Sequence, residues 1–321
     1  MSIGSSYPLS RPAPDPRPAR PLPRVRAEAA HLGWRLLAAA LCHLLALGLT
    51  GVVFLSTPAG QWLDGLLLPR AERGGGYQQE TVLVDPAKTV LATFGSPTLL
   101  AALLGAVLLV GLLRRRLVAG VVGVGMVLGA VLVAGAVKSV LPRPDLQIAS
   151  STTHNSFPSG HVAVATALLL AFMLVLPGWA RRLLAVPGAV GVSVIAAGTM
   201  IAGWHRFSDA LGGVLLGVSL FYLATAALTA LGGATDPAGT EPRGGPERGA
   251  TWLRLVEGAV GSIVLLWVLL VVVPGLSASV ERGPLVAIVA VTGLTMLAVG
   301  LAASLVRSTD FATPFSLLSK R

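Results

Sequence analysis

Long runs of apolar residues, separated by short polar segments, make up most of this chain. We place eight of them, at residues 32–55, 89–113, 117–141, 160–177, 183–204, 210–231, 254–274 and 284–306. Each has about the 20 residues that an α-helix needs to cross roughly 30 Å of hydrocarbon. The runs lack the alternation of apolar and polar residues that marks a membrane β-barrel. The pattern predicts an all-α protein, a polytopic membrane helix bundle.

The polar segments divide the chain into parts. Residues 1–31 are rich in proline and arginine, so they cannot form a packed core and are expected to be a disordered tail. Residues 32–231 contain six of the runs and form the predicted core. A flexible linker is expected at 232–250. Two additional membrane helices follow within 251–306, before a tail at 307–321.

Arginine clusters indicate how the bundle is oriented. Arg114, Arg115 and Arg116 separate the second run from the third, and Arg181 and Arg182 separate the fourth from the fifth. If every run crosses the membrane, these clusters fall on the same side as the linker and both tails. Membrane proteins keep such segments in the cytoplasm. We therefore expect a multi-pass protein of the cell membrane with both termini cytoplasmic.

The segment 56–88 lies on the opposite side in this topology. It carries Trp62, Leu63, Leu66, Leu67 and Leu68, at a spacing that suits a short helix in the membrane interface. Two interpretations stay open. The helix either forms part of a lid over a lipid site or is a simple connector.

Composition supports a membrane protein and argues against a nucleic-acid partner. The chain is 54% hydrophobic and 12% charged, whereas a soluble domain carries about a quarter charged residues. The net charge is +10, but the arginines lie in clusters between apolar runs, as in cytoplasmic loops. Membrane lipids are the expected surroundings. The single Cys42 excludes an internal disulfide.

Few titratable groups remain near the spans once the cytoplasmic clusters are set aside. Such groups are costly at a membrane and usually functional. The predicted topology brings all of them to the same outer edge, from three separate segments. They are Lys138, Arg143, Asp145, His154, His161, His205, Arg206 and Asp209.

The segment from Asn155 to His161 predicts an anion site. Pro158, Ser159 and Gly160 are residues that begin helices and leave backbone N–H groups uncovered. A helix N-terminus of this kind binds phosphate. Lys138 and Arg143 would supply two cations beside it.

His205 and Asp209 are four residues apart, which places them on one face if they share a helix. The carboxylate would then hold one ring nitrogen and leave the other free to attack phosphorus. With His161, two histidines would divide the work, one attacking phosphorus and one protonating the leaving oxygen. His154 is interpreted as a loop residue. No carboxylate cluster at this edge suits a metal.

At these residues the chain resembles the type 2 phosphatidic acid phosphatase family, the membrane branch of a superfamily that includes bacterial acid phosphatases and vanadium haloperoxidases. The family has three motifs: Lys, six residues, Arg-Pro; Pro-Ser-Gly-His; and Ser-Arg, five residues, His, three residues, Asp. The second is complete as residues 158–161, and the third keeps His205 and Asp209. The resemblance covers the six-span core and excludes the last two spans.

The resemblance implies a role for each matching residue. His205 would be the nucleophile that forms a phosphohistidine, oriented by Asp209, and His161 would be the general acid. Four groups would bind the phosphoryl oxygens, namely Ser159, the Gly160 amide, Lys138 and Arg143. Neither a metal nor a cofactor is implied.

This sequence departs from the family pattern at two places. Lys138 and Arg143 are separated by four residues instead of six, and Thr199 stands where the third motif has its arginine. Arg206 either replaces that arginine, because positions 199 and 206 would share a helix face, or the site is weakened. We therefore count Arg206 among the expected phosphate ligands.

Two classes of function follow. The first is an integral-membrane phosphatase that hydrolyses a lipid phosphate or an isoprenoid pyrophosphate on the extracytoplasmic face, without metal. A phosphotransferase that uses the same phosphohistidine belongs to this class. The second is a non-catalytic lipid-phosphate binder or transporter, which the missing motif arginine favours. The sequence assigns no oligomeric state.

Overall fold

The structure is a computed structural model that describes residues 23–67, 83–148, 151, 153–231 and 282–306. Throughout these ranges the regular elements are helices, and no strand occurs among them. Five helices are long and apolar enough to cross a membrane, or six when one bent pair is counted as a single span. A polytopic helical bundle is confirmed. The expected span at 254–274 and the linker at 232–250 lie outside the described residues.

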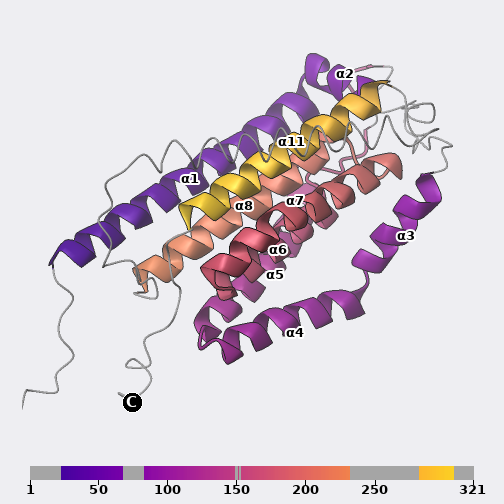
Figure 1. Ribbon diagram of the computed structural model, residues 1–321. Helices are drawn as coiled ribbons and strands as arrows, with labels where there is room; N and C mark the ends of the chain where they lie inside the picture. The colour runs from indigo at the N-terminus through magenta and orange to yellow at the C-terminus, as the bar shows by residue number, and fades with distance from the viewer. Residues whose placement is uncertain (1–22, 68–82, 149–150, 152, 232–281, 307–321) are drawn as a thin grey trace, which may run out of the picture.

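The helices, in chain order, are α1 (Pro23–Ser56), α2 (Pro58–Leu66), α3 (Val84–Phe94), α4 (Pro97–Leu113), α5 (Leu117–Val140), α6 (Gly160–Val175), α7 (Gly178–Ile201), α8 (Phe207–Ala230) and α11 (Arg282–Leu305). Figure 1 shows α1 lying along α8, with α11 packed on α7 and α8. The expected terminal tail is wrong in part, because α1 begins at Pro23. Residues 1–22 and 307–321 lie outside the described residues.

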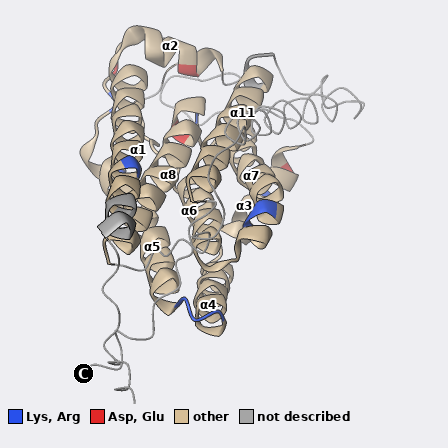
Figure 2. Ribbon diagram, turned by 60° about the vertical axis from the view of Figure 1, so that its left-hand side comes forward, with Lys and Arg blue, Asp and Glu red and all other residues tan. Residues whose placement is uncertain are grey.

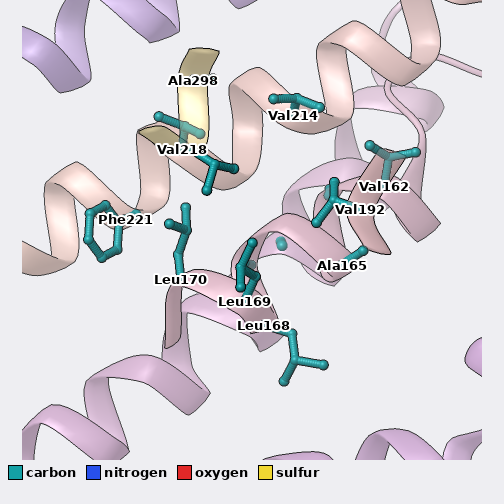
Figure 3. Packing of buried hydrophobic residues seen from close by; sticks show 14 of the residues in the cluster. Val162, Ala165, Leu168, Leu169, Leu170, Val192, Val214, Val218, Phe221 and Ala298 are labelled. Atoms are coloured by element: carbon teal, nitrogen blue, oxygen red, sulfur yellow. The ribbon is translucent and has the colours of Figure 1, made fainter. Parts of the chain in front are cut away.

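Helix α6 lies at the centre of the bundle, in contact with α5, α7 and α8. Its residues are apolar except for His161 and Thr166, and most of its side chains are buried, so it has no continuous polar face. Leu170, fully buried, points towards Val218 and Phe221 of α8 (Figure 3). With 16 residues, α6 is shorter than the 160–177 run predicted. It ends before Pro177, since proline cannot continue the ladder of backbone hydrogen bonds.

The predicted span at 89–113 is two helices, not one. Helix α3 ends at Phe94 and α4 begins at Pro97, and their axes differ by 53°. The residues between them explain the break. Ser96 accepts a hydrogen bond from the Leu99 N–H, and Pro97 occupies the first turn of α4, which together form a strong helix start.

Two arginines of the predicted cytoplasmic clusters are buried and hold the end of α6. Arg116 donates to the carbonyls of Val175 and Leu176, and Arg181 donates to the carbonyls of Leu176 and Val306. The last carbonyls of a helix lack hydrogen-bond donors within it, and these guanidinium groups donate to them instead. Helix α7 therefore begins at Gly178, earlier than the expected residue 183, and carries Arg181 in its first turns.

Two glycines of α8 let it approach α6 closely. A Cβ atom on Gly213 would lie 2.7 Å from the Ser159 carbonyl oxygen, and one on Gly217 would lie 2.6 Å from the Thr166 Cβ. A similar pair on α5, Gly125 and Gly129, has nothing within 4 Å of either position. The small-residue pair of α8 thus serves packing within the bundle.

We expect Gly213→Ala to destabilise the protein by about 1–3 kcal/mol, because the new methyl group has no room against Ser159. Gly125→Ala is the matched control. It adds the same methyl group to a helix with open space around it and should be neutral or slightly stabilising. Thermal unfolding in detergent measures both. Equal shifts for the two variants would contradict the close packing of α6 and α8.

Candidate active site

The candidate residues gather at one end of the bundle, where α5 ends, α6 begins, α7 ends and α8 begins. Helix α2 crosses this end, and the arginine-bearing connection between α4 and α5 lies at the opposite end (Figure 2). Ser159 donates its backbone N–H to the Asp209 carbonyl at 2.8 Å. This bond joins the start of α6 to the start of α8.

His205 lies on a tight turn between α7 and α8. Helix α7 ends at Ile201, and Gly203 has a φ of 70°, which glycine adopts readily. The backbone N–H groups of Trp204 and His205 then both donate to the Thr199 carbonyl, at 2.9 and 3.1 Å. Thr199, which stands in place of the motif arginine, therefore holds the backbone of His205.

One carboxylate oxygen of Asp209 contacts His205 and accepts two further hydrogen bonds. Its Oδ2 lies 3.4 Å from His205 Nδ1 and 2.8 Å from the Arg206 N–H, and it also accepts from the Ser156 hydroxyl. Asp209 is fully buried. The bond to the Arg206 N–H is that of a capping carboxylate in the first turn of a helix. Asp209 thus caps the N-terminus of α8 and orients the imidazole of His205.

The expected common helix for His205 and Asp209 is wrong, although the contact is present. His205 precedes α8, which begins at Phe207, and the contact is formed by the turn and the helix cap. For the same reason positions 199 and 206 share no helix face, since α7 has ended before Arg206. With a proton on Nδ1, facing Asp209, Nε2 of His205 is the nitrogen available for attack.

The start of α6 is built as the sequence predicted. Ser159 is the N-cap, and its side chain accepts from the Val162 N–H. A Cβ atom on Gly160 would lie 3.9 Å from Lys138 Nζ, so the ammonium group lies close to the first residue of this helix. Positive charge and uncovered N–H groups coincide there, which is what a phosphoryl group requires.

His161, in the first turn of α6, contacts both the α3–α4 break and the turn that carries His205. Its Nε2 would lie 2.9 Å from a Cβ atom on Gly95, and its ring centroid is 5.7 Å from that of Trp204. Trp204 directly precedes His205 in the chain. His161 therefore lies beside the turn that carries His205.

Arg206 is buried between the α6 connection and α8. Its guanidinium donates to the Ser156 hydroxyl at 3.1 Å and to the His154 carbonyl at 3.4 Å. Ser156 also binds Asp209, so Arg206 lies next to the carboxylate that holds His205. His154 is a loop residue whose side chain is exposed.

Arg143 points to α2 and to its own connection. Its NH1 lies 3.7 Å from Asp64 Oδ2, and its NH2 donates to the Ser151 hydroxyl at 3.3 Å. Asp64 also accepts from the N–H and the hydroxyl of Ser208. The short helix expected in segment 56–88 is present as α2, with Trp62 exposed and Asp64 buried.

Burial raises the pKa of Asp64 to about 6, with the charge of Asp209 adding to the rise and Ser208, Arg206 and Arg143 opposing it. The folded state therefore binds this proton more tightly than the unfolded state. The stabilisation that the proton provides is complete below pH 4 and is lost as pH rises through 6.

A comparison of the parent with Asp64→Asn isolates this effect. We expect the stability of the parent relative to the variant to fall by about 3 kcal/mol between about pH 4 and about pH 7, since each pKa unit corresponds to 1.36 kcal/mol. Thermal unfolding in detergent at each pH measures the difference. A difference that stays constant with pH would show that Asp64 ionises normally.

Several residues of the site were not predicted. Asp64, Ser156 and Ser208 are hydrogen-bonded within it. All three lie in segments that the sequence marked, but neither residue type nor spacing singled them out. In the part of the chain that the structure describes, no group of three or more His, Cys, Asp or Glu residues is arranged to hold a metal ion.

One comparison with known proteins gives a match. The sequence model of the PAP2 superfamily matches residues 121–232, a segment that contains Lys138, His161, His205 and Asp209. Comparison with curated proteins and with solved structures gives no match. The part of the chain from within α5 to the end of α8 therefore matches the PAP2 superfamily, in agreement with the resemblance to type 2 phosphatidic acid phosphatases.

Proposed function

We propose that this protein is a metal-independent integral-membrane phosphatase that cleaves a lipid phosphate or an isoprenoid pyrophosphate through a phosphohistidine on His205. One observation carries the proposal. The Asp209-held imidazole of His205 and the half-buried imidazole of His161 lie at one end of the bundle. Beside them the Lys138 ammonium lies near the N-terminus of α6.

The first step is attack on phosphorus. The lone pair of His205 Nε2 forms the P–N bond while the bond from phosphorus to the leaving oxygen breaks, and His161 donates a proton to that oxygen. Asp209 stabilises the positive charge that develops on the imidazole. Lys138, Arg206, the Ser159 hydroxyl and the Gly160 amide bind the phosphoryl oxygens, and Arg143 contributes positive charge from beside Asp64.

The second step regenerates the protein. Water attacks phosphorus, His161 now accepts its proton, and the P–N bond breaks so that its electron pair returns to His205. Inorganic phosphate leaves. If an alcohol attacks in place of water, the same intermediate gives a phosphotransferase.

A lipid is the expected substrate because of where the site lies. It is at the end of a bundle of membrane-crossing helices, next to α2, whose Trp62, Leu63 and Leu66 are exposed. A head group at the membrane interface would meet the site without leaving the bilayer. A non-catalytic lipid-phosphate binder is the second candidate, because Thr199 replaces the motif arginine.

The test is phosphate release by the purified full chain, in detergent and in vesicles, from a panel that spans phosphatidic acid, phosphatidylglycerol phosphate and isoprenoid pyrophosphates. We expect release from at least one without added metal and in the presence of a chelator. Tight binding of these lipids with no release from any of them would establish the binder instead.

The proposal includes an orientation. The arginine-rich connections lie at the end opposite the site, and such connections face the cytoplasm, so the site is proposed to be extracytoplasmic. In a Cys42→Ser background, Thr153→Cys, which is exposed near the site, should react with a membrane-impermeant maleimide applied to intact cells. Arg114→Cys should react only after permeabilisation. The reverse pattern would invert the topology.

A further inference from the structure

Helix α2 turns a carboxylate inwards. Asp64 is fully buried, although its neighbours Trp62, Leu63 and Leu66 are more than a third exposed (53%, 41% and 49%). Placing a carboxylate away from water is costly unless it is paired and hydrogen-bonded. A helix that served only to connect two spans would have no reason to bury this side chain.

The partners of Asp64 belong to two segments of the site. Its Oδ1 accepts from the Ser208 N–H at 3.1 Å, and its Oδ2 accepts from the Ser208 hydroxyl at 2.6 Å. Oδ2 also lies 3.7 Å from NH1 of Arg143. Ser208 directly precedes Asp209 in the first turn of α8, and Arg143 is in the connection that follows α5.

Helix α2 makes a second contact with the connection that follows α5. Gln61, fully buried, donates from Nε2 to the Pro144 carbonyl at 2.9 Å and to the Leu55 carbonyl at 2.7 Å. The buried face of α2 therefore contacts both the connection after α5 and the first turn of α8. Any movement of α2 would shift Ser208, and with it Asp209 and the turn that carries His205.

We propose that Asp64 is a positioning residue of the active site, which fixes the first turn of α8 and the guanidinium of Arg143 relative to each other. This inference rests on the proposed function. It assigns α2 a role other than a lid or a connector. The exposed apolar face of α2 would lie against the membrane, and its buried polar residues would orient the groups that act on phosphate.

The test compares Asp64→Asn with Asp85→Asn in the full chain. The first keeps the shape of Asp64 and removes its charge, and the second makes the same change on an exposed carboxylate at the start of α3. Two quantities are measured well below the unfolding temperature: kcat on the best lipid of the panel, and the Kd for inorganic phosphate. Both report on folded protein, so a loss of stability alone leaves them unchanged.

We expect Asp64→Asn to lower kcat and weaken phosphate binding by about tenfold to a hundredfold each, as for residues that orient the ligands of a metal site. Asp85→Asn should stay within about twofold of the parent. If Asp64 acts through Arg143, the double variant Asp64→Asn/Arg143→Gln should be no worse than Asp64→Asn by more than about twofold. If the loss in the double variant equals the product of the losses in the two single variants, Asp64 does not act through Arg143.

Each failure is distinct. If the parent binds phosphate but cleaves no lipid, the proposed function falls, and the Kd of Asp64→Asn alone decides on positioning. If Asp64→Asn matches the parent in kcat and Kd, the positioning role is overturned while the proposed function stands. A parent that neither cleaves lipids nor binds phosphate overturns both.

Discussion

Replacement of His205 by alanine is expected to lower kcat by about 10⁴-fold or more, the scale on which removal of a nucleophile acts. No other described side chain in the site has an imidazole held by a buried carboxylate. With the nucleophile gone, water would have to attack the phosphate directly. Phosphate release from the best lipid of the panel measures the loss.

The intermediate gives the same experiment a second readout. Rapid acid-free quenching of the parent with a ³²P-labelled lipid should leave label on the protein that is stable in alkali and lost in acid, as expected for a phosphoramidate. His205→Ala should show none. His31→Ala, which alters an exposed histidine on α1, is the matched control and should behave as the parent. Label that persists in His205→Ala would assign the nucleophile elsewhere.

Replacement of His161 by alanine should lower kcat for an alkyl phosphate by about 10²- to 10⁴-fold, the usual contribution of a general acid. The loss should depend on the leaving group. An alkoxide is a poor leaving group and needs the proton that His161 donates, whereas 4-nitrophenolate leaves without one. The variant should therefore retain much of its rate of phosphohistidine formation from 4-nitrophenyl phosphate.

The two substrates act as controls for each other within one protein. The rate compared is that of phosphohistidine formation, because hydrolysis of the intermediate is common to both substrates. A misfolded or displaced site would lower this rate equally for both, whereas loss of the proton donor lowers it only for the substrate with the poor leaving group. Equal losses for both substrates would contradict the role of His161 as general acid. His205→Ala provides the reference, because it should abolish cleavage of both.

The apolar pattern predicted the bundle well because burial in a membrane leaves a simple signal in the sequence. The pattern failed at helix ends, because capping residues determine where each helix begins and ends. The break at Ser96 and Pro97 divides a run that hydropathy treats as one span. Helix α7 begins at Gly178, directly after Pro177, so Arg181 falls within it. Hydropathy averages over such positions, whereas a single side chain that bonds to the backbone determines them.

The motifs predicted which residues lie at one end of the bundle, but not the local geometry that brings them together. His205 and Asp209 were paired on the assumption of a common helix, yet a glycine turn and a capping carboxylate bring them together. Asp64 was missed because its partners are more than 70 residues away in the chain, at Arg143 and Ser208. No spacing rule links α2 to α8.

The brevity of α6 has a consequence for biogenesis. Its 16 residues extend about 24 Å, too little to reach from one head-group layer to the other. Its last carbonyls depend on Arg116 and Arg181, one from the segment synthesised before it and one from the segment after. We therefore expect α6 to become stable in the membrane only after α7 has been synthesised.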